Sequence, residues 1–452
     1  MNNMKIDVSI FKAYDIRGIF PSQLNADVVY KIGRAFVDYM QIKEVALGHD
    51  ARSSWMELYS SLIRGINDAG AKVYDLGMIG TEELYFSVGY FGYESGLMLT
   101  ASHNLSEYNG LKFVGKDAFS ISENTGLENI KRLVIEKEYA PTNNSKNVEK
   151  ISSHKFLKKA IFNIVDVSKI KPLKVVIDAG NGVGGILVNE IYSNTPLNII
   201  PMYFEPDGRF PNHEANPTKE ENTVALRKRV VLEKANIGIA LDGDGDRCVF
   251  VDEKGELSSG YFLTAILAKK MLIKYPNAKI VHENRFKWAI VDAIKSSGGV
   301  GSECRAGYAF LKPKMREVGA VFGGETSSHF FYKDLFYSVS SMLTIGLILE
   351  ELSSSGKKMS EILAPYREKY FISGEINFKV DNPNEILLEV KEKYKADGLE
   401  IEELDGVAVD NNRQWRFSLR KSNTEPLIRL CVEGKTKEIV SRIVKEVSAI
   451  IK

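Results

Sequence analysis

Three aspartates recur at alternate positions in one short segment, Asp242-Gly243-Asp244-Gly245-Asp246. Their carboxylates would repel one another strongly if nothing were paired with them. The two interleaved glycines allow a tight loop that aims all three carboxylates at one point. A hard divalent cation with oxygen ligands would remove the repulsion. The spacing therefore predicts a metal site, and Mg²⁺ suits it because that ion is commonly shared between carboxylates and a phosphate.

The aspartate loop has two alternative interpretations, a calcium loop and a solvated turn. Counted from Asp242, an EF-hand calcium loop would place ligands at Asp244, Asp246 and Glu253, as the sequence does. Its sixth position needs a glycine, however, and Arg247 stands there. The flanking segments also have the pattern of strands rather than helices. A solvated acidic turn is the second alternative, and the apolar strand that precedes the loop argues against it.

Ser102 lies in another polar segment, Thr100–Asn104 (TASHN), which follows an apolar run. A serine hydroxyl is a weak nucleophile, so it needs a base or a metal, or it must carry the transferable group itself. Its neighbour His103 is weak evidence for a triad, because triad members are rarely adjacent in sequence. Alone, the segment would be an ordinary turn. Beside an acidic metal loop, Ser102 becomes the predicted carrier of the phosphate that shares the metal.

Two further polar segments could recognise a phosphosugar. Gly323–His329 (GGETSSH), which we call the sugar loop, combines a carboxylate, hydroxyls and an imidazole, and these groups suit adjacent sugar hydroxyls. A helix-capping turn is the alternative interpretation. Arg420–Pro426 (RKSNTEP), which we call the phosphate loop, combines two cations, two hydroxyls and an amide. An arginine fork with short donors grips a phosphate, and an ordinary polar hairpin is the alternative.

The elements that must position these segments follow one repeated pattern. A short apolar, β-branched run ends in a polar turn at Val45–Asp50, Val175–Asn181 and Ile280–Asn284, and helical patterning follows each time. A second apolar run then leads into one of the polar loops. Strands that alternate with helices predict a parallel or mixed sheet, and ligands gather beyond the carboxyl ends of such strands.

The chain of 452 residues is long enough for about three or four domains. We predict an α/β fold with three related mixed α/β-sheet domains and a smaller C-terminal α+β domain. The expected boundaries are 1–148 with the serine loop, 149–253 with the metal loop, 254–368 with the sugar loop, and 369–452 with the phosphate loop.

Composition limits the possible partners. The net charge of +1 does not indicate binding to nucleic acid or to an anionic membrane. Any anion that the protein binds must therefore be held by a local group of positive charges. The three cysteines, Cys248, Cys304 and Cys431, lack metal-ligand spacing and are interpreted as small buried hydrophobes in a reducing compartment. The first residues lack the apolar core of a signal peptide. We expect a cytoplasmic protein.

The four loops, in this order, resemble the α-D-phosphohexomutase superfamily over essentially the whole chain, and within it the bacterial and archaeal phosphomannomutase/phosphoglucomutase group. Four supporting segments carry the same resemblance: Phe11–Gly18 (FKAYDIRG), Gly48–Ser54 (GHDARSS), Asp178–Gly182 (DAGNG) and Pro206–His213 (PDGRFPNH).

The resemblance implies four domains around a central cleft, each of which contributes one loop. It implies that Ser102 is a phosphoserine and that Ser102, Asp242, Asp244 and Asp246 bind Mg²⁺. Lys112 matches a general acid/base, and Arg17 and Arg247 match catalytic positions. The implied substrate contacts are Tyr14, Arg285, Tyr308, Glu325, Ser327, His329, Arg420, Ser422, Asn423 and Thr424.

The implied reaction interconverts hexose 1-phosphate and hexose 6-phosphate, with mannose or glucose as the sugar, through a hexose 1,6-bisphosphate that also serves as activator. The expected partner is a small phosphosugar, and the expected state is a monomer or a homodimer. Three alternatives remain: a phosphoglucosamine mutase, a non-catalytic phosphosugar-binding homologue and a magnesium-dependent phosphatase.

Several positions depart from the family pattern. Leu105 stands where a proline commonly follows the serine loop, and Ser328 replaces a glycine of the sugar loop. Tyr308 stands where a histidine is frequent, and Arg285 where a lysine is frequent. Ser338–Ser341 replaces an expected Asp-Asp-Gly. The core chemistry at Ser102 and the metal loop is intact, and the departures in the third domain concern the sugar contacts and the preference for mannose or glucose.

Overall fold

The computed structural model describes residues 6–142, 147–422 and 427–451. The chain forms two compact units, and each is described by itself. The first unit contains Met1–Leu257 and Phe331–Gly356, and the second contains Ser258–Phe330 and Lys357–Lys452.

The first unit begins with a mixed sheet of seven strands in the order β1-β5-β4-β2-β3-β7, with β6 beside β5. Strands β2, β3, β4 and β7 are parallel, whereas β1 and β6 run antiparallel to β5, which itself is antiparallel to β4. The strands are β1 (Ile16–Ile19), β2 (Glu44–His49), β3 (Lys72–Met78), β4 (Ser95–Leu99), β5 (Tyr108–Gly115), β6 (Phe119–Ile121) and β7 (Val148–Lys150).

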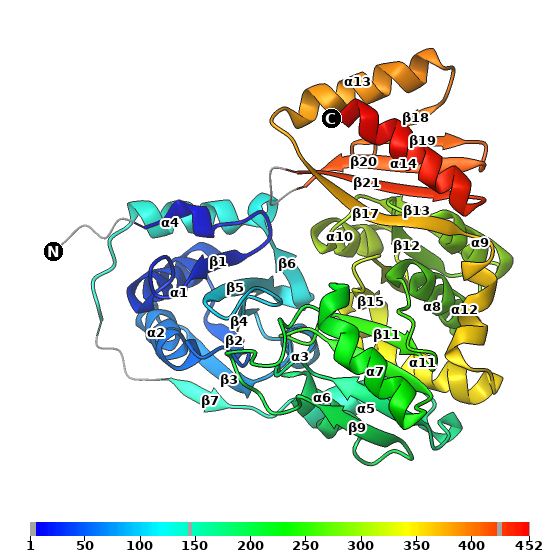
Figure 1. Cartoon of the computed structure of the whole chain (residues 1–452). Helices are drawn as coiled ribbons and strands as arrows, with labels where there is room; N and C mark the ends of the chain where they lie inside the picture. The colour runs from blue at the N-terminus through cyan, green and yellow to red at the C-terminus, as the bar shows by residue number, and fades with distance from the viewer. Residues whose placement is uncertain (1–5, 143–146, 423–426, 452) are drawn as a thin grey trace. The chain divides into compact units, whose positions relative to one another are not determined.

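Helices cover both faces of this sheet. On one face lie α1 (Ala26–Met40), α2 (Trp55–Asp68) and α4 (Leu127–Glu136), which pack together (Figure 1). Their apolar sides and the facing strand residues form one buried core. On the other face α3 (Thr81–Phe91) packs its own apolar side into a second core cluster. Burial of these apolar sides is the main favourable contribution to stability of the layered arrangement.

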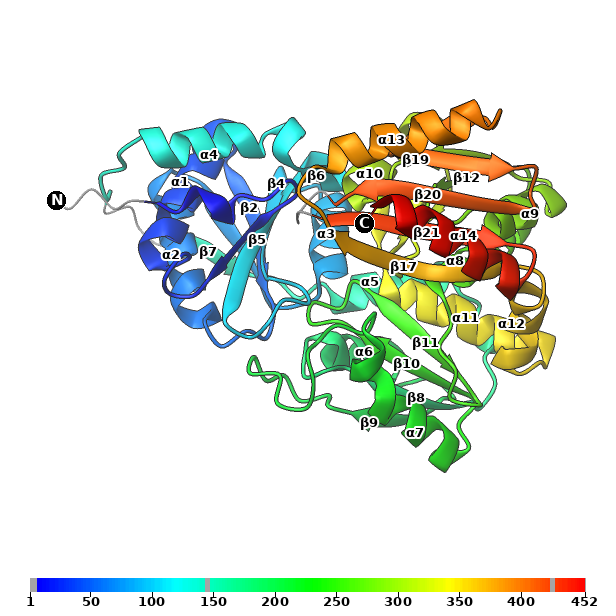
Figure 2. The ribbon, with the colours of Figure 1, turned by 45° about the horizontal axis from the view of Figure 1, so that its top comes forward.

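The second sheet of the first unit has the order β11-β10-β8-β9 (Figure 2). Three of its strands are parallel and β11 is antiparallel to β10. The strands are β8 (Lys174–Asp178), β9 (Asn198–Met202), β10 (Ile237–Leu241) and β11 (Cys248–Asp252). The associated helices are α5 (His154–Ile164), α6 (Gly184–Tyr192) and α7 (Val224–Glu233).

A later segment of the chain also belongs to the first unit. Strand β16 (Ser338–Val339) pairs antiparallel with β15 (Phe330–Tyr332), and α11 (Ser341–Ser355) follows. The helix α11 contacts α5, α6 and β11. The hydroxyl of Tyr192 donates a hydrogen bond of 2.5 Å to the carbonyl oxygen of Met342, and a Cβ on Gly346 would lie 2.8 Å from that hydroxyl oxygen. The close approach explains why a glycine is needed there.

The second unit contains three parallel strands with β12 between β13 and β14. These strands are β12 (Lys279–Glu283), β13 (Val300–Cys304) and β14 (Phe322–Gly324). Four helices accompany them: α8 (Gly260–Lys274), α9 (Trp288–Ser296), α10 (Tyr308–Val318) and α12 (Met359–Arg367).

The last part of the second unit is an antiparallel sheet in the order β17-β21-β20-β19-β18. Two helices pack their apolar sides against it and close one core. The elements are β17 (Phe371–Lys379), α13 (Pro383–Ala396), β18 (Ile401–Glu402), β19 (Val407–Asn411), β20 (Trp415–Lys421), β21 (Leu427–Gly434) and α14 (Lys437–Ile451).

Short 3-10 helices connect several of these elements, at Val8–Ile10, Lys116–Ala118, Glu123–Thr125, Val167–Lys169, Glu220–Thr223 and Lys333–Leu335.

The predicted α/β class, with mixed sheets and a smaller antiparallel C-terminal part, is confirmed. The serine, metal and sugar loops follow β4, β10 and β14, as the strand pattern predicted. All three cysteines are buried, as expected. Within the described residues, no helix combines the length and apolar character needed to cross a membrane.

Candidate active site

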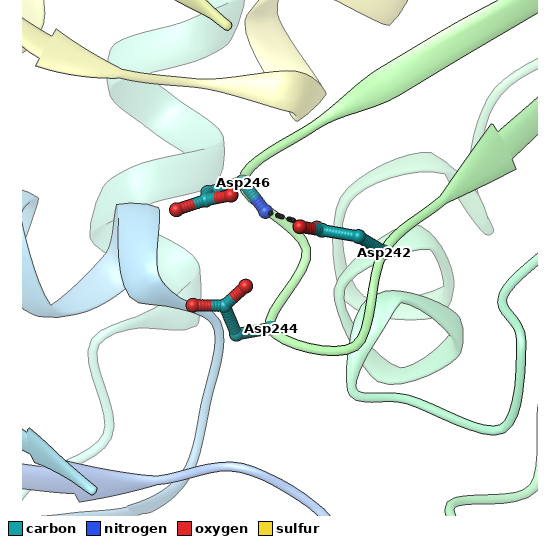
Figure 3. Close-up of side chains that lie close together, drawn as sticks. All are labelled: Asp242, Asp244 and Asp246. Carbon is teal, nitrogen blue, oxygen red and sulfur yellow. Dashed lines mark hydrogen bonds between the residues drawn. The ribbon is translucent and has the colours of Figure 1, made fainter. Parts of the chain in front are cut away.

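The aspartate loop connects β10 to β11 in a tight turn. The amide of Gly245, which has a φ of +71°, donates a 3.1 Å hydrogen bond to the carbonyl oxygen of Asp242. The amides of Asp246 and Arg247 donate to the Oδ1 atom of Asp242 at 3.0 and 3.1 Å. One oxygen from each of the three aspartates lies within 4.8 Å of the other two (Figure 3). The predicted convergence of the carboxylates is therefore present.

The three aspartates are almost completely buried. Burial raises the pKa of Asp242 well above its usual value, and the negative charges of Asp246 and Asp244 raise it further. The Oδ1 atom of Asp244 is buried and accepts no hydrogen bond from any residue that the structure describes. Clustered oxygen donors, mutual repulsion and a buried acceptor fit a hard divalent cation such as Mg²⁺.

Lys112, on β5, supplies a positive charge to this loop. Its Nζ atom lies 2.6 Å from an Oδ2 atom of both Asp244 and Asp246, and 3.3 Å from the Oγ1 atom of Thr81. Burial lowers the pKa of Lys112, but the carboxylates of Asp244 and Asp246 raise it more, so the side chain is an ammonium. Lys112, together with Arg247 beside Asp242, sets two positive charges against three carboxylates, which leaves room for the charge of a metal ion.

Thr81 was not predicted from the sequence. It is the first residue of α3, and its amide donates to the carbonyl oxygen of Asp244 at 2.9 Å. Its hydroxyl donates to the Oδ2 atom of Asp244 at 2.5 Å. Thr81 belongs to a helix that covers the seven-stranded sheet, whereas Asp244 belongs to the loop between β10 and β11. The side chain and backbone of Thr81 thus fix the middle aspartate from the other sheet region of the first unit.

Ser102 lies beyond β4 and is buried against the metal loop. Its Oγ atom donates to the Oδ2 atom of Asp242 at 3.2 Å and lies 3.1 Å from the Nδ1 atom of His103. Its φ of +50° is in the left-handed region, which costs free energy for a residue with a side chain. The amide of Ser102 donates to the Oγ1 atom of Thr100 at 2.8 Å, and that hydroxyl donates to Asp50 at 2.6 Å.

Arg52 explains how the strained serine loop is held, and no functional role for it was predicted. This fully buried guanidinium donates to the carbonyl oxygens of Ser102, Asn104, Leu105 and Tyr108 at 2.7 to 2.9 Å. All four acceptors are backbone atoms, so Arg52 fixes the path of the chain around the serine. Only its position within the segment GHDARSS was a signal in the sequence.

A loop that follows β9 packs onto Arg52 from the other sheet of the first unit. The ring of Phe210 lies over the guanidinium, with its centroid 5.3 Å from the Cζ atom of Arg52. A Cβ on Gly208 would lie only 2.3 Å from the amide nitrogen of Ser53. The glycine therefore permits close contact between the segments PDGRFPNH and GHDARSS, which are far apart in the sequence.

The other predicted residues of the first unit lie around the same loops. Arg17 donates to Asp15, to the carbonyl oxygen of Ala101 at 3.3 Å and to the side chain of Asn104 at 2.5 Å. The Nε atom of Arg247 lies 3.8 Å from the Oδ2 atom of Asp242. Tyr14 is half-buried and immediately precedes Asp15.

In the second unit, the predicted sugar loop brings three residues together. The Oε2 atom of Glu325 lies 2.9 Å from the Oγ atom of Ser327 and 2.8 Å from the Nδ1 atom of His329. Burial raises the pKa of Glu325, but the hydrogen bond and charge of His329 outweigh it, so the pKa is lowered. Ser328, which replaces the usual glycine, has a φ of +65°, a conformation that favours glycine.

The predicted phosphate contacts are only partly described. Arg420 is the next-to-last residue of β20 and has a buried side chain, and the amide of Ser422 donates to the carbonyl oxygen of Leu427 at 2.9 Å. Asn423 and Thr424 lie outside the described residues. Tyr308 is half-buried at the start of α10, after Gly307. Arg285 does join Arg420, through the carboxylate of Glu375.

Comparison with known proteins decides the family. Four sequence profiles match consecutive parts of the chain, described as phosphoglucomutase/phosphomannomutase alpha/beta/alpha domains I, II and III and C-terminal domain; they match residues 8–140, 154–255, 259–370 and 375–450. The chain belongs to the phosphoglucomutase/phosphomannomutase family. It is thus a mutase, as the resemblance implied.

Individual members of the family support the same conclusion. A protein of Xanthomonas campestris pv. campestris (strain B100) named "Phosphohexose mutases" is 40% identical over 425 residues, which is 94% of this chain and 95% of that protein. A phosphomannomutase of Escherichia coli K12 is 37% identical over 435 residues, 95% of each. The crystal structure of a phosphoglucomutase/phosphomannomutase family protein from Burkholderia thailandensis superposes with a TM-score of 0.89 at 28% identity and covers 99% of this chain and 98% of that one.

Proposed function

We propose that this mutase interconverts hexose 1-phosphate and hexose 6-phosphate through a phosphorylated Ser102 and a hexose 1,6-bisphosphate. The observation that carries the proposal is the 3.2 Å contact between the buried Oγ atom of Ser102 and Asp242 of the aspartate loop. A serine at that distance from three convergent carboxylates is positioned for a phosphoryl oxygen to share a metal ion with them.

We assign Asp242, Asp244, Asp246 and the phosphorylated Ser102 as the residues that would hold Mg²⁺. The bound ion would neutralise charge on the transferring phosphoryl group. Lys112 and Arg247 contribute further positive charge, because one lies 2.6 Å from two of the aspartates and the other 3.8 Å from the third. Stabilisation of this kind is a large part of phosphoryl-transfer catalysis.

The transfer breaks the bond between phosphorus and the Oγ atom of Ser102 and forms a bond from phosphorus to a sugar hydroxyl. The product of this first step is the 1,6-bisphosphate; the sugar hydroxyl loses its proton, and the released Oγ atom of Ser102 gains one and becomes a hydroxyl again. The reverse transfer, from the other phosphate of the sugar, restores phosphoserine. Arg52 and its neighbours hold the Ser102 backbone so that the serine oxygen returns to one position in both steps.

Recognition of the sugar falls to the second unit in this proposal. Glu325, Ser327 and His329 present a carboxylate, a hydroxyl and an imidazole within 3.2 Å of one another, and such groups pair with adjacent sugar hydroxyls. Arg420, with Ser422, Asn423 and Thr424, would hold the phosphate that the substrate already carries. Tyr308 and Arg285 are the proposed further contacts. Mannose and glucose are both retained as substrates.

A coupled assay tests the function. With Mg²⁺ and a catalytic amount of glucose 1,6-bisphosphate, the purified chain should convert mannose 1-phosphate and glucose 1-phosphate to their 6-phosphates. Ser102→Ala should reduce turnover by at least about 1,000-fold, because it removes the atom that carries the phosphoryl group.

The matched control is Ser87→Ala. Ser87 is also buried, but within the described parts of the chain its hydroxyl donates only to the carbonyl oxygen of Glu83 in its own helix. Turnover should therefore be retained. Full activity of the Ser102→Ala variant would show that the serine assignment is wrong. Sugar-phosphate binding without any turnover by the parent chain would favour the non-catalytic alternative.

A further inference from the structure

A carboxylate outside the four predicted loops lies among three guanidinium groups of the second unit. The Oε2 atom of Glu375 lies 3.0 Å from the Nη1 atom of Arg285 and 3.3 Å from the Nη2 atom of Arg420. Its Oε1 atom lies 3.0 Å from the Nη1 atom of Arg429. We call these four residues the arginine cluster. Two of its members, Arg285 and Arg420, are proposed substrate contacts.

A β-bulge places Glu375 in this cluster. In the pairing of β17 with β21, Ile372 lies opposite Glu433, but Glu375 lies opposite Cys431, so β17 contains one extra residue. Gly374, with a φ of +73°, supplies the conformation that such a bulge requires. Because side chains alternate along a strand, a regular β17 would turn Glu375 to the other face of the sheet. Bulges of this kind commonly re-aim a side chain next to an active site.

The arginine cluster is linked to the sugar loop as well. The Nη2 atom of Arg285 donates to Glu283 at 2.6 Å. The other oxygen of Glu283 accepts hydrogen bonds from both the amide and the hydroxyl of Thr326, which lies beside Glu325 in the sugar loop. A continuous series of hydrogen bonds and ion pairs thus connects the sugar loop with Arg420.

Unused donors in the arginine cluster favour an incoming anion. Arg285 and Arg420 are buried, and the Nε atom of each has no hydrogen-bond partner among the described residues. The two oxygens of Glu375 are shared among three guanidiniums, so the Nε donors of Arg285 and Arg420 remain available to an anion. Burial raises the pKa of Glu375, but the three arginines outweigh that effect, so the pKa is lowered and the carboxylate is ionised.

We propose that Glu375 is an exchangeable internal counter-ion. It holds the guanidiniums of Arg420 and Arg285 in place until the phosphate of the substrate replaces it as their bound anion. The inference rests on the proposed function, in which the phosphate loop binds and releases a sugar phosphate at each turnover. Buried arginines without an anion would be costly, so the carboxylate keeps them ordered between substrates. Its negative charge also opposes the phosphate and limits how tightly the site binds it.

Glu375 is therefore a positioning and affinity-setting residue. Phosphate bound too tightly would slow release without helping the transfer step, because only binding that is stronger in the transition state accelerates the reaction. The competition between the carboxylate and the phosphate gives the site enough affinity for recognition while the sugar can still leave.

The test is a calorimetric titration of the full chain with inorganic phosphate, without Mg²⁺, for the parent and for Glu375→Gln. Glutamine keeps the shape of the side chain and removes its charge. The dissociation constant for phosphate should fall roughly five- to tenfold in the variant. Arg420→Gln should abolish this binding in both backgrounds, which assigns the titrated site to the arginine cluster.

The kinetic prediction separates this role from a merely structural one. Glu375→Gln should lower both KM and kcat for the hexose phosphate, because substrate binds more tightly and product leaves more slowly. A loss of structure would instead raise KM. The matched control is Asp292→Asn, since Asp292 also lies between two cations, Lys369 and Arg413, but contacts no proposed substrate residue among those that the structure describes. It should leave phosphate binding unchanged.

Unchanged or weaker phosphate binding by Glu375→Gln would overturn the proposal. If that variant does not fold, Glu375→Asp keeps the charge on a shorter side chain. The ion pair between this carboxylate and Arg420 should weaken, and phosphate should bind about two- to threefold more tightly. Unchanged or weaker binding of phosphate would again overturn the proposal. The turnover assay of the parent tests the proposed function independently, so the two failures are distinguishable.

Discussion

The two units contain sites of opposite charge. In the first unit, three buried aspartates face Lys112 and Arg247, which leaves an excess of negative charge. In the second unit, the three guanidiniums of the arginine cluster surround the carboxylate of Glu375. Although the net charge of the chain is only +1, carboxylates are concentrated in one site and guanidiniums in the other. One site fits a metal cation, and the other fits a phosphate anion.

The sites also differ in what holds them. The serine loop of the first unit is fixed by hydrogen bonds from Arg52 to four backbone carbonyls. The arginine cluster is held by contacts between side chains, centred on Glu375. Backbone contacts fix one geometry, whereas ionic side-chain contacts can be exchanged for a ligand. The difference suits a fixed site for chemistry and an exchangeable site for recognition.

The largest effect is expected where the negative charge of the first unit is altered. Asp244→Asn should reduce turnover by about 1,000-fold or more and weaken the Mg²⁺ dependence of the reaction, because it removes a proposed metal ligand and a partner of Lys112. A Mg²⁺ titration of the coupled assay measures both effects. Asp207→Asn, a change at a half-buried carboxylate that pairs with exposed Arg209, is the control and should be nearly neutral. Equal Mg²⁺ dependence in both variants would contradict the metal assignment.

The next effect tests the rigidity of the serine loop. Arg52→Lys keeps the charge, but an ammonium has three N–H donors and cannot donate to all four carbonyls, so we expect kcat to fall about 10- to 100-fold while KM changes little. Steady-state kinetics measure the two constants, and circular dichroism checks that the variant is folded. A rise in KM with unchanged kcat would show that Arg52 serves substrate binding instead. Arg64→Lys, at a cation that lies over the ring of Tyr30, is the control and should retain kcat.

The sequence predicted the chemistry of these sites better than their supports. Ser102 and the aspartate loop carry a local signal, namely unusual residues directly after apolar strands. Arg52 and Thr81 carry little signal, because each acts through contacts with segments far away in the chain. Glu375 could not be assigned to a face, since a single bulge reverses the alternation on which such a prediction depends.

The layered fold was predictable because strand and helix patterns alternate regularly. The grouping of these elements into two compact units was less predictable. The segment 331–356 lies within the expected third domain, yet its contacts assign it to the first unit. The helix α11 is apolar on most sides and is covered by α5 and α6 among others, which its own sequence cannot specify. The four domain boundaries stay a prediction.

The smallest effect concerns backbone strain in the sugar loop of the second unit. Ser328→Gly should stabilise the folded state by about 0.5 to 1 kcal/mol, since the left-handed conformation costs serine more than glycine, partly offset by the greater entropy of glycine when unfolded. Denaturant unfolding measures the change. Ser327→Gly, at a neighbour outside the left-handed region, should destabilise. A lower stability of Ser328→Gly would show that the Ser328 side chain contributes contacts that outweigh the strain.

The central claim is that Ser102 carries the transferred phosphoryl group. Intact-mass measurement after incubation with glucose 1,6-bisphosphate and Mg²⁺, followed by peptide fragmentation, tests it most directly. We predict one added phosphoryl group, located on Ser102, which is lost to an excess of hexose monophosphate and never appears on Ser102→Ala. Active protein that carries no phosphate on Ser102 under these conditions would contradict the account.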